Sequence, residues 1–288
     1  IQSCSACHGV KGRSDGASTK KIVNIATDAI WPRNLSKPWK FRRGDKRKQI
    51  FQTLRTGLSL TAMPMFSPRI FKDEQIWDLV NYVQTLSPSQ KPETPKFLNV
   101  KRVDGKLPDA PNDPSWKTVD SNFYPLAGQI IQSEKVTYPI IDNVVVKALH
   151  NGKDIAFYLH WDDPTVDPIL KKSTTVEESP APPLPAHLQT DEPEEQPTEE
   201  LKPQEFPDSI AIQFPTSIND DNEKPYFLNG DSEHPVNLWK WSSHPMKALE
   251  MTAKGIMKTK VQKDSSQNLT SKASFKYGRY FLVMKRPL

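Results

Sequence analysis

Apolar residues follow two different periods in the two parts of the chain. Up to about residue 88 they recur every three to four positions, which is typical of amphipathic helices. From about residue 114 they alternate with polar residues or form short runs between turn residues, which is typical of strands. The pattern therefore predicts an α + β multidomain chain, in which an all-α domain is followed by an antiparallel β-sandwich domain.

Two helices are expected to close the first part. Residues 45–54 place Ile50, Phe51 and Leu54 on one face, and Gly57 follows as a stop signal. A second helix opens around residues 71–74 with acidic side chains in its first turn and ends near Ser87. The apolar face of this second helix consists of Ile76, Trp77, Val80, Val83 and Leu86.

The second part contains five segments with the composition of strands. The dipeptide Asn151-Gly152 separates the first two and is a strong signal for a hairpin turn. The five segments are residues 143–150, 154–161, 209–214, 236–241 and 280–284.

Composition divides the chain further. Residues 1–88 form the first domain and residues 113–288 the second, and the Pro- and Lys-rich residues 89–112 are expected to be an extended linker, in which residues 97–103 could add a short strand. Residues 173–208 are rich in Pro and acidic side chains and poor in large apolar ones, so we expect a solvated insert, or an arm that reaches over a neighbouring subunit. Residues 262–271 are expected to be a loop.

The charges are unevenly spread along the chain. The formal net charge is +5, with basic residues concentrated in the first 90 positions. Because no nucleic-acid recognition motif accompanies them, a basic face that steers an acidic redox partner is the better interpretation. No run of about 18 apolar residues occurs, so no membrane span is expected.

The strongest motif lies close to the first residue. The chain has 2 cysteines, Cys4 and Cys7, and His8 follows the second. This C-x-x-C-H pattern is the attachment signature of a c-type haem, in which two thioethers reach the vinyl groups and the imidazole reaches the iron. A thioredoxin-like redox pair would need a preceding buried strand, and a zinc site would need two more soft ligands at suitable spacing, so both are weaker interpretations.

A Met-Pro loop between the two expected helices offers the second iron ligand. Met63 and Met65 both qualify, and the other would then fill the core. We favour Met63 because Pro64 directly behind it restricts the loop. Trp31, Trp39 and Phe41 lie in a Pro-containing stretch before these helices and suit packing at a haem edge.

The C-x-x-C-H motif, the Met-Pro loop and the closing amphipathic helix with Trp77 and Tyr82 resemble the class I cytochrome c family. The resemblance covers residues 1–88. It implies an all-α domain that carries haem c on Cys4 and Cys7, with His8 and Met63 as the iron ligands.

The second domain resembles the ethylbenzene dehydrogenase γ-subunit family. The resemblance rests on residues 113–116, 144–152, 161–164, 210–215, 225–231 and 235–241. It implies a β-sandwich that binds haem b, usually between a Met and a Lys. It also implies the third subunit of a molybdenum enzyme, and the fusion to a cytochrome c domain is similar to the γ-type subunit of nitrite oxidoreductases.

The sequence departs from this family at the haem b ligand itself. Asn229 stands where the family has its Met, so Asn229 could be a weak ligand, a nearby residue could replace it, or the haem b could have been lost. The candidate replacements are His234, Met246 and Met284. Lys285 is the favoured Lys ligand and Lys147 the runner-up. Either lysine would need burial that keeps its amine neutral.

These observations predict a non-catalytic electron-transfer subunit of a nitrite oxidoreductase-like molybdenum complex. Haem b and haem c would connect the iron–sulphur β subunit and the molybdopterin α subunit to a soluble redox acceptor. The alternative is a haem c protein whose sandwich has lost haem b and serves as a binding or docking module. Two less favoured hypotheses are a peroxidase at an open haem b iron, with His234 as the acid–base group, and a sugar- or lipid-binding sandwich with Trp239 and Trp241 as a stacking platform.

The expected compartment is the periplasm or an equivalent extracytoplasmic space of a bacterium. Only three residues precede Cys4, so we expect that an N-terminal segment with an export signal is missing from this sequence.

Overall fold

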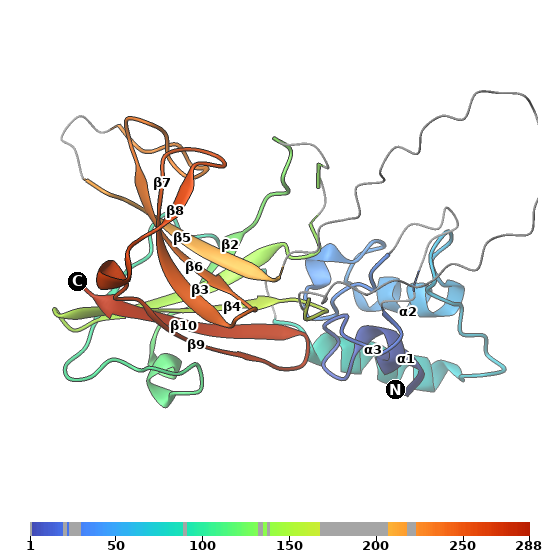
Figure 1. Cartoon of the computed structure of the whole chain (residues 1–288). Coiled ribbons are helices and arrows are strands. Elements are labelled where there is room, and N and C mark those ends of the chain that lie inside the picture. The colour runs from blue at the N-terminus through green and yellow to red at the C-terminus, as the bar shows by residue number, and fades with distance from the viewer. Residues whose placement is uncertain are drawn as a thin grey trace, which may run out of the picture.

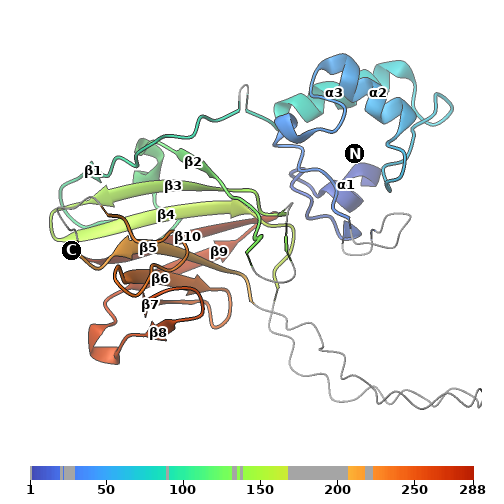
Figure 2. The ribbon, with the colours of Figure 1, turned by 90° about the horizontal axis from the view of Figure 1, so that it is seen from above.

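The structure is a computed structural model that describes residues 2–19, 22, 30–88, 91–131, 135–136, 139–167, 207–217 and 223–288. A helical domain and a β-rich domain follow one another along the chain (Figures 1 and 2). The predicted fold class is thereby confirmed. The predicted insert at 173–208 lies outside the described residues, apart from its last two positions.

The helical domain contains α1 (Gln2–His8), the 3-10 turn η2 (Pro38–Lys40), α2 (Arg47–Thr56) and α3 (Asp73–Thr85). Both predicted helices are present, each shifted by about two residues at one or both ends, which is the usual uncertainty of helix ends. The first turns of α2 and α3 are closed by Gln49 and Gln75, whose side chains accept the backbone N–H of Lys46 and Lys72.

The core of the helical domain joins α2 to α3. Ile50 and Leu54 of α2 are buried against Ile76 and Val80 of α3, as their spacing predicts. Phe51 stacks on Trp77 with ring centroids 4.4 Å apart. These contacts fix the two helices on one side of the space that α1 faces.

The β-rich domain is built from two sheets. The six-stranded sheet has the order β1-β3-β4-β10-β9, with β2 paired to β3. Its strands are β1 (Lys101–Arg102), β2 (Asn122–Pro125), β3 (Asn143–His150), β4 (Asp154–Asp162), β9 (Thr270–Phe275) and β10 (Arg279–Pro287). The four-stranded sheet has the order β5-β6-β7-β8. Its strands are β5 (Ser209–Pro215), β6 (Val236–Ser242), β7 (Lys247–Ala253) and β8 (Thr259–Val261).

Strand pairing confirms the predicted antiparallel sandwich with one exception. The β3–β4 hairpin turns at Asn151-Gly152, and Gly152 has the positive φ of 85° that this turn requires. The exception is β1, which pairs parallel with β3 through Lys101–Leu149 and Arg102–His150. The loop expected at 262–271 contains the 3-10 turn η5 (Asp264–Ser266) and gives way to β9 at Thr270.

A single apolar core lies between the two sheets. Trp161 and Tyr280 of the six-stranded sheet stack at 5.0 Å, and Trp241 of the other sheet meets Tyr280 edge-on at 5.5 Å. Trp239 and Trp241 are 4% and 0% exposed. The proposed stacking platform for a sugar is therefore wrong, because both rings are buried in the core.

The outer face of the six-stranded sheet has a core of its own. Leu107, Trp116 and Val119 pack against Tyr158 and Val283 there. Leu107 is 2% exposed although it lies in the expected linker. The segment before β2 therefore covers the sheet.

Candidate haem site

The helix α1 places both cysteines on one wall of a cavity. Cys4 and Cys7 are three positions apart, so they face the same side of the helix. Both are free thiols and both line the cavity.

A loop folds back over the end of α1 and satisfies its last carbonyls. Ser18 N–H donates to Ala6 at 2.8 Å, Ser14 N–H to His8 at 2.9 Å, and the Thr19 hydroxyl to Cys7 at 2.7 Å. A Cβ at Gly16 would lie 2.3 Å from the Ala6 oxygen, so only glycine permits this approach. The loop therefore locks the cysteine-bearing helix in place.

The imidazole of His8 is oriented by one hydrogen bond. Its Nδ1 lies 2.9 Å from the carbonyl oxygen of Arg33, and because a carbonyl only accepts, Nδ1 carries the proton. The lone pair is then on Nε2. Burial lowers the pKa of His8, although the Arg33 bond opposes this, so the ring is held neutral as an iron ligand must be.

The Met loop is fixed opposite α1 by backbone contacts. Leu58 N–H donates to Met63 at 3.2 Å, and Phe66 N–H donates to Leu54 at 2.9 Å. A Cβ at Gly57 would lie 2.8 Å from the Met63 oxygen, so the loop passes directly over this glycine. Met63 lines the cavity and packs on the helical core.

Met65 does not line the cavity and is 63% exposed. The geometry therefore favours Met63 as the thioether ligand, and Met65 is not the core filler that the sequence suggested.

The cavity has a volume of about 1050 Å³. Two thiols, one imidazole and one thioether meet in it, which is the donor set that haem c requires. Apolar side chains line it as well, among them Ile50, Leu54, Leu79, Val83 and Leu86, and so do charged ones such as Arg13 and Lys37. The residues present therefore fit a covalent haem c.

The aromatic stretch before α2 has two roles rather than one. Trp31 and Phe41 line the cavity as expected. Trp39 instead meets Phe123 of β2 edge-on, with centroids 6.3 Å apart. Trp39 therefore belongs to the contact between the domains, which the sequence did not reveal.

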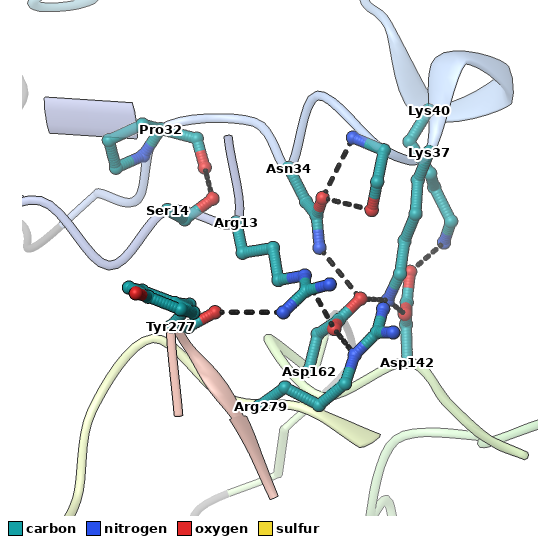
Figure 3. A network of polar contacts seen from close by, with 11 residues as sticks. Arg13, Ser14, Pro32, Asn34, Lys37, Lys40, Asp142, Asp162, Tyr277 and Arg279 are labelled. Atoms are coloured by element: carbon teal, nitrogen blue, oxygen red, sulfur yellow. Dashed lines mark hydrogen bonds and ion pairs between the residues drawn. The ribbon is translucent and has the colours of Figure 1, made fainter. Parts of the chain in front are cut away.

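A polar network joins the two domains beside the cavity (Figure 3). Asp162, at the end of β4, is 7% exposed and bound by Arg279 at 2.6 Å, Asn34 at 2.9 Å and Lys37 at 3.6 Å. Asp142, just before β3, lies 2.5 Å from Lys37 and 3.1 Å from Lys40. Burial alone would raise the pKa of Asp162, but the surrounding cations hold it below its ordinary value. Apart from the half-exposed Lys40, the network therefore consists of largely buried charges that compensate one another.

The structure does not bring the two predicted haem b ligands together. Asn229 has a positive φ of 64°, and its backbone bonds to Gln213 and Gly255, so its loop is attached to the four-stranded sheet. Lys285 is on the outer face of the other sheet and is paired with Asp109. The inward-pointing neighbour of Lys285 is Met284, which is fully buried between the sheets.

The alternative haem b ligands either bind other residues or are exposed to solvent. His234 lies 3.3 Å from Glu223 and 3.2 Å from Asp231. Met246 is 54% exposed in the turn between β6 and β7. Lys147 donates to the Trp116 carbonyl at 2.7 Å, and burial lowers its pKa. Haem b ligation by any of these residues stays a prediction.

The described part of the chain shows neither a metal-binding cluster nor a membrane-spanning helix. No three His, Cys, Asp or Glu side chains gather there as a metal site would require. Nor does any helix among those residues have the length and apolar character needed to cross a bilayer.

Comparisons with solved structures give partial matches. A reducing HAO-like protein complex from Kuenenia stuttgartiensis is 32% identical over 30% of this chain and 38% of that chain, with a TM-score of 0.28. A protein described as carbohydrate-binding from Bacteroides uniformis is 11% identical over 66% and 71%, with a TM-score of 0.35. A family 9 carbohydrate-binding module from Caldicellulosiruptor kristjanssonii, in complex with cellotriose, is 11% identical over 66% of both chains, with a TM-score of 0.34.

The chain thus spans well under half of the first of these structures. Among curated proteins, no sequence matches the chain.

Family models match both domains. The cytochrome c model matches residues 2–87, which contain the Cys4–His8 motif and Met63. The ethylbenzene dehydrogenase model matches residues 113–264, which is more than half of the chain. The protein is therefore a member of the ethylbenzene dehydrogenase family that carries a cytochrome c domain in front of its β-sandwich.

Proposed function

We propose that the chain is an electron-transfer subunit of a nitrite oxidoreductase-like molybdenum complex. In this role it passes electrons between the partner's iron–sulphur clusters and an external acceptor in the periplasm or an equivalent compartment. The observation that carries the proposal is the meeting of Cys4, Cys7, His8 and Met63 in one cavity.

Haem c would supply one-electron chemistry there, and because His8 and Met63 would both bind its iron, it would offer no open site for substrate. The residues of this chain therefore hold and orient the haem. Cys4 and Cys7 tether it, the Arg33 carbonyl keeps the Nε2 lone pair of His8 available, and the backbone at Gly57 keeps the Met63 loop in place. This set of roles supports a non-catalytic subunit.

The basic surface of the cytochrome domain supports an acidic redox partner. Arg42 and Arg43 line the mouth of the cavity, and Lys40 is half-exposed beside it. Positive charge near a haem accelerates encounter with negatively charged proteins, in a salt-dependent way.

The proposal includes a second haem, which the β-sandwich would bind. We propose haem b with Asn229 and Lys285 as its ligands, which requires that these two residues of different sheets come closer together when haem b binds. The alternative, a sandwich that has lost haem b and docks other domains, is favoured by two observations. Lys285 is bound to Asp109, and Met284 is enclosed by the core between the sheets.

The test is the number of haems per chain after maturation in a host competent for cytochrome c assembly. We expect one haem that acid–acetone does not extract, because Cys4 and Cys7 hold it covalently. A Cys4→Ser, Cys7→Ser double variant should lose that haem. A wild-type chain without covalent haem would refute the proposal.

The same extraction distinguishes a sandwich that binds haem b from one that has lost it and serves for docking. One extractable haem that disappears in Lys285→Leu, but not in the control Lys272→Leu of the neighbouring β9, supports haem b ligation. Covalent haem alone supports the docking alternative.

A further inference from the structure

The connection between β2 and β3 exposes more apolar surface than a solvated loop normally does. We call the described residues of this connection, 126–131, 135–136 and 139–142, the arm. Hydrogen bonds from Leu126 N–H to Asp142 at 2.8 Å and from Val136 N–H to Gln129 at 2.7 Å close it on itself. Its exposed apolar side chains are Leu126 (42%), Ile130 (61%), Ile131 (48%), Val136 (49%) and Ile140 (49%). Several exposed apolar side chains on one short connection suggest a surface that something covers.

Part of this apolar surface belongs to the haem cavity. Leu126, Ala127, Gly128, Pro139 and Ile140 line the same cavity as Cys4, Cys7, His8 and Met63. Ile130 does not line it, although it lies on the same arm. The cavity thus has walls from both domains.

We propose that the arm of the sandwich forms one wall of the haem c pocket, so that the haem held at Cys4 and Cys7 covers Leu126 and Ile140. The inference rests on the proposed function, since it requires haem c in this cavity. It adds that the β-sandwich takes part in haem c binding.

The polar network fixes the arm at the edge of the pocket. Asp142 ends the arm and binds Lys37 and Lys40 of the cytochrome domain. Lys37 and Asp142 also line the cavity themselves. The ion pairs that join the domains therefore also determine how closely the arm approaches the haem.

Enclosure by the arm has an electrochemical consequence. Apolar walls exclude water and lower the local dielectric, which disfavours the more charged ferric state. The arm should therefore raise the midpoint potential of haem c above that of the same haem with a wetter edge.

The test uses the full chain with its covalent haem and a redox titration of that haem. Ile140→Ser and Leu126→Ser are each expected to lower the midpoint potential, and the double variant should lower it further. Ile140→Met, which restores an apolar side chain, should return the potential towards the wild-type value. Ile130→Ser is the control, because it removes an exposed isoleucine of the arm, 61% exposed against 49% for Ile140, that does not line the cavity.

Two results would overturn the inference while covalent haem is retained. One is an unchanged potential in the Ile140→Ser, Leu126→Ser double variant. The other is an equal change in Ile130→Ser. Both differ from failure of the proposed function, which would appear as absence of covalent haem from the wild-type chain.

Discussion

The ammonium group of Lys37 lies 2.5 Å from the carboxylate of Asp142, although the two residues belong to different domains. Lys37 is 7% exposed and also reaches Asp162, so one buried cation serves two carboxylates. Removing one partner of a buried pair leaves the other charge uncompensated in a poorly hydrated place.

We therefore expect Lys37→Met to destabilise the docked arrangement of the domains by about 3 kcal/mol. Thermal unfolding of the haem-bearing chain measures this. Lys40→Met is the matched control, because the Lys40 side chain is 47% exposed and its pair with Asp142 should contribute less than about 1 kcal/mol. Equal losses in the two variants would contradict a special role for Lys37.

Met63 and Met65 should respond differently to truncation. Met63→Ala is expected to abolish the charge-transfer absorption of the Met–Fe(III) bond and to lower the potential of haem c, because the soft neutral thioether favours Fe(II). Met65→Ala should leave the absorption intact and change stability by less than about 0.5 kcal/mol, since Met65 is largely exposed. The reverse result would identify Met65 as the ligand.

Gly57→Ala tests the support of the Met loop. Gly57 has φ 65° and ψ −168°, a region that side chains rarely enter, and a Cβ there would overlap the backbone of Met63 to Met65. We expect a loss of about 3 kcal/mol together with a weakened Met–Fe(III) absorption. Gly105→Ala controls for backbone strain, because Gly105 also has a positive φ but nothing lies near its Cβ position. Strain alone should cost about 1 kcal/mol there.

The raised pKa of the buried Asp163 carboxyl predicts that stability depends on pH in an unusual way. It is 3% exposed, and burial, reinforced by Asp208 and Asp167, raises its pKa to about 7. Between about pH 4 and pH 7 the folded form keeps the proton that the unfolded form has lost, so stability falls as the pH rises through this window.

The variant Asp163→Asn removes this titration and can still accept the hydrogen bond from Thr165. It should be more stable than the wild type at pH 8, by up to about 4 kcal/mol, and the difference should vanish towards pH 4. Thermal unfolding at both pH values measures the difference. A constant difference at all pH values would contradict the raised pKa.

Local chemistry explains why the haem c site could be predicted from the sequence. Cys4, Cys7 and His8 occupy one helical turn, and the Pro after Met63 marks a loop, so short segments carry most of the information. The α2 and α3 faces follow the 3.6-residue period because Ile50, Leu54, Ile76 and Val80 form one core.

The missed elements depend on partners far away in sequence. The sequence of strand β7 does not alternate between apolar and polar residues, because the charged Glu250 is buried. Its charge is compensated by Arg286, which lies 36 residues away in sequence. The strands β2 and β8 are short, and β9 consists mostly of polar residues, so none of the three shows a clear apolar pattern. The residues around Trp39 and Lys37 give no sequence signal for the contacts with the sandwich, because each contact forms only when the two domains meet.

The parallel pairing of β1 with β3 has a consequence for the strength of the domain contact. It anchors the chain at Lys101, and Leu98 and Val100 already pack on the core of the sandwich, so the tether between α3 and the sandwich is short. A short tether converts docking into an intramolecular step with an effective concentration in the millimolar range. The tether therefore adds to the ion pairs of Lys37 with Asp142 and Asp162, and it keeps the two domains next to one another in a variant that lacks these pairs.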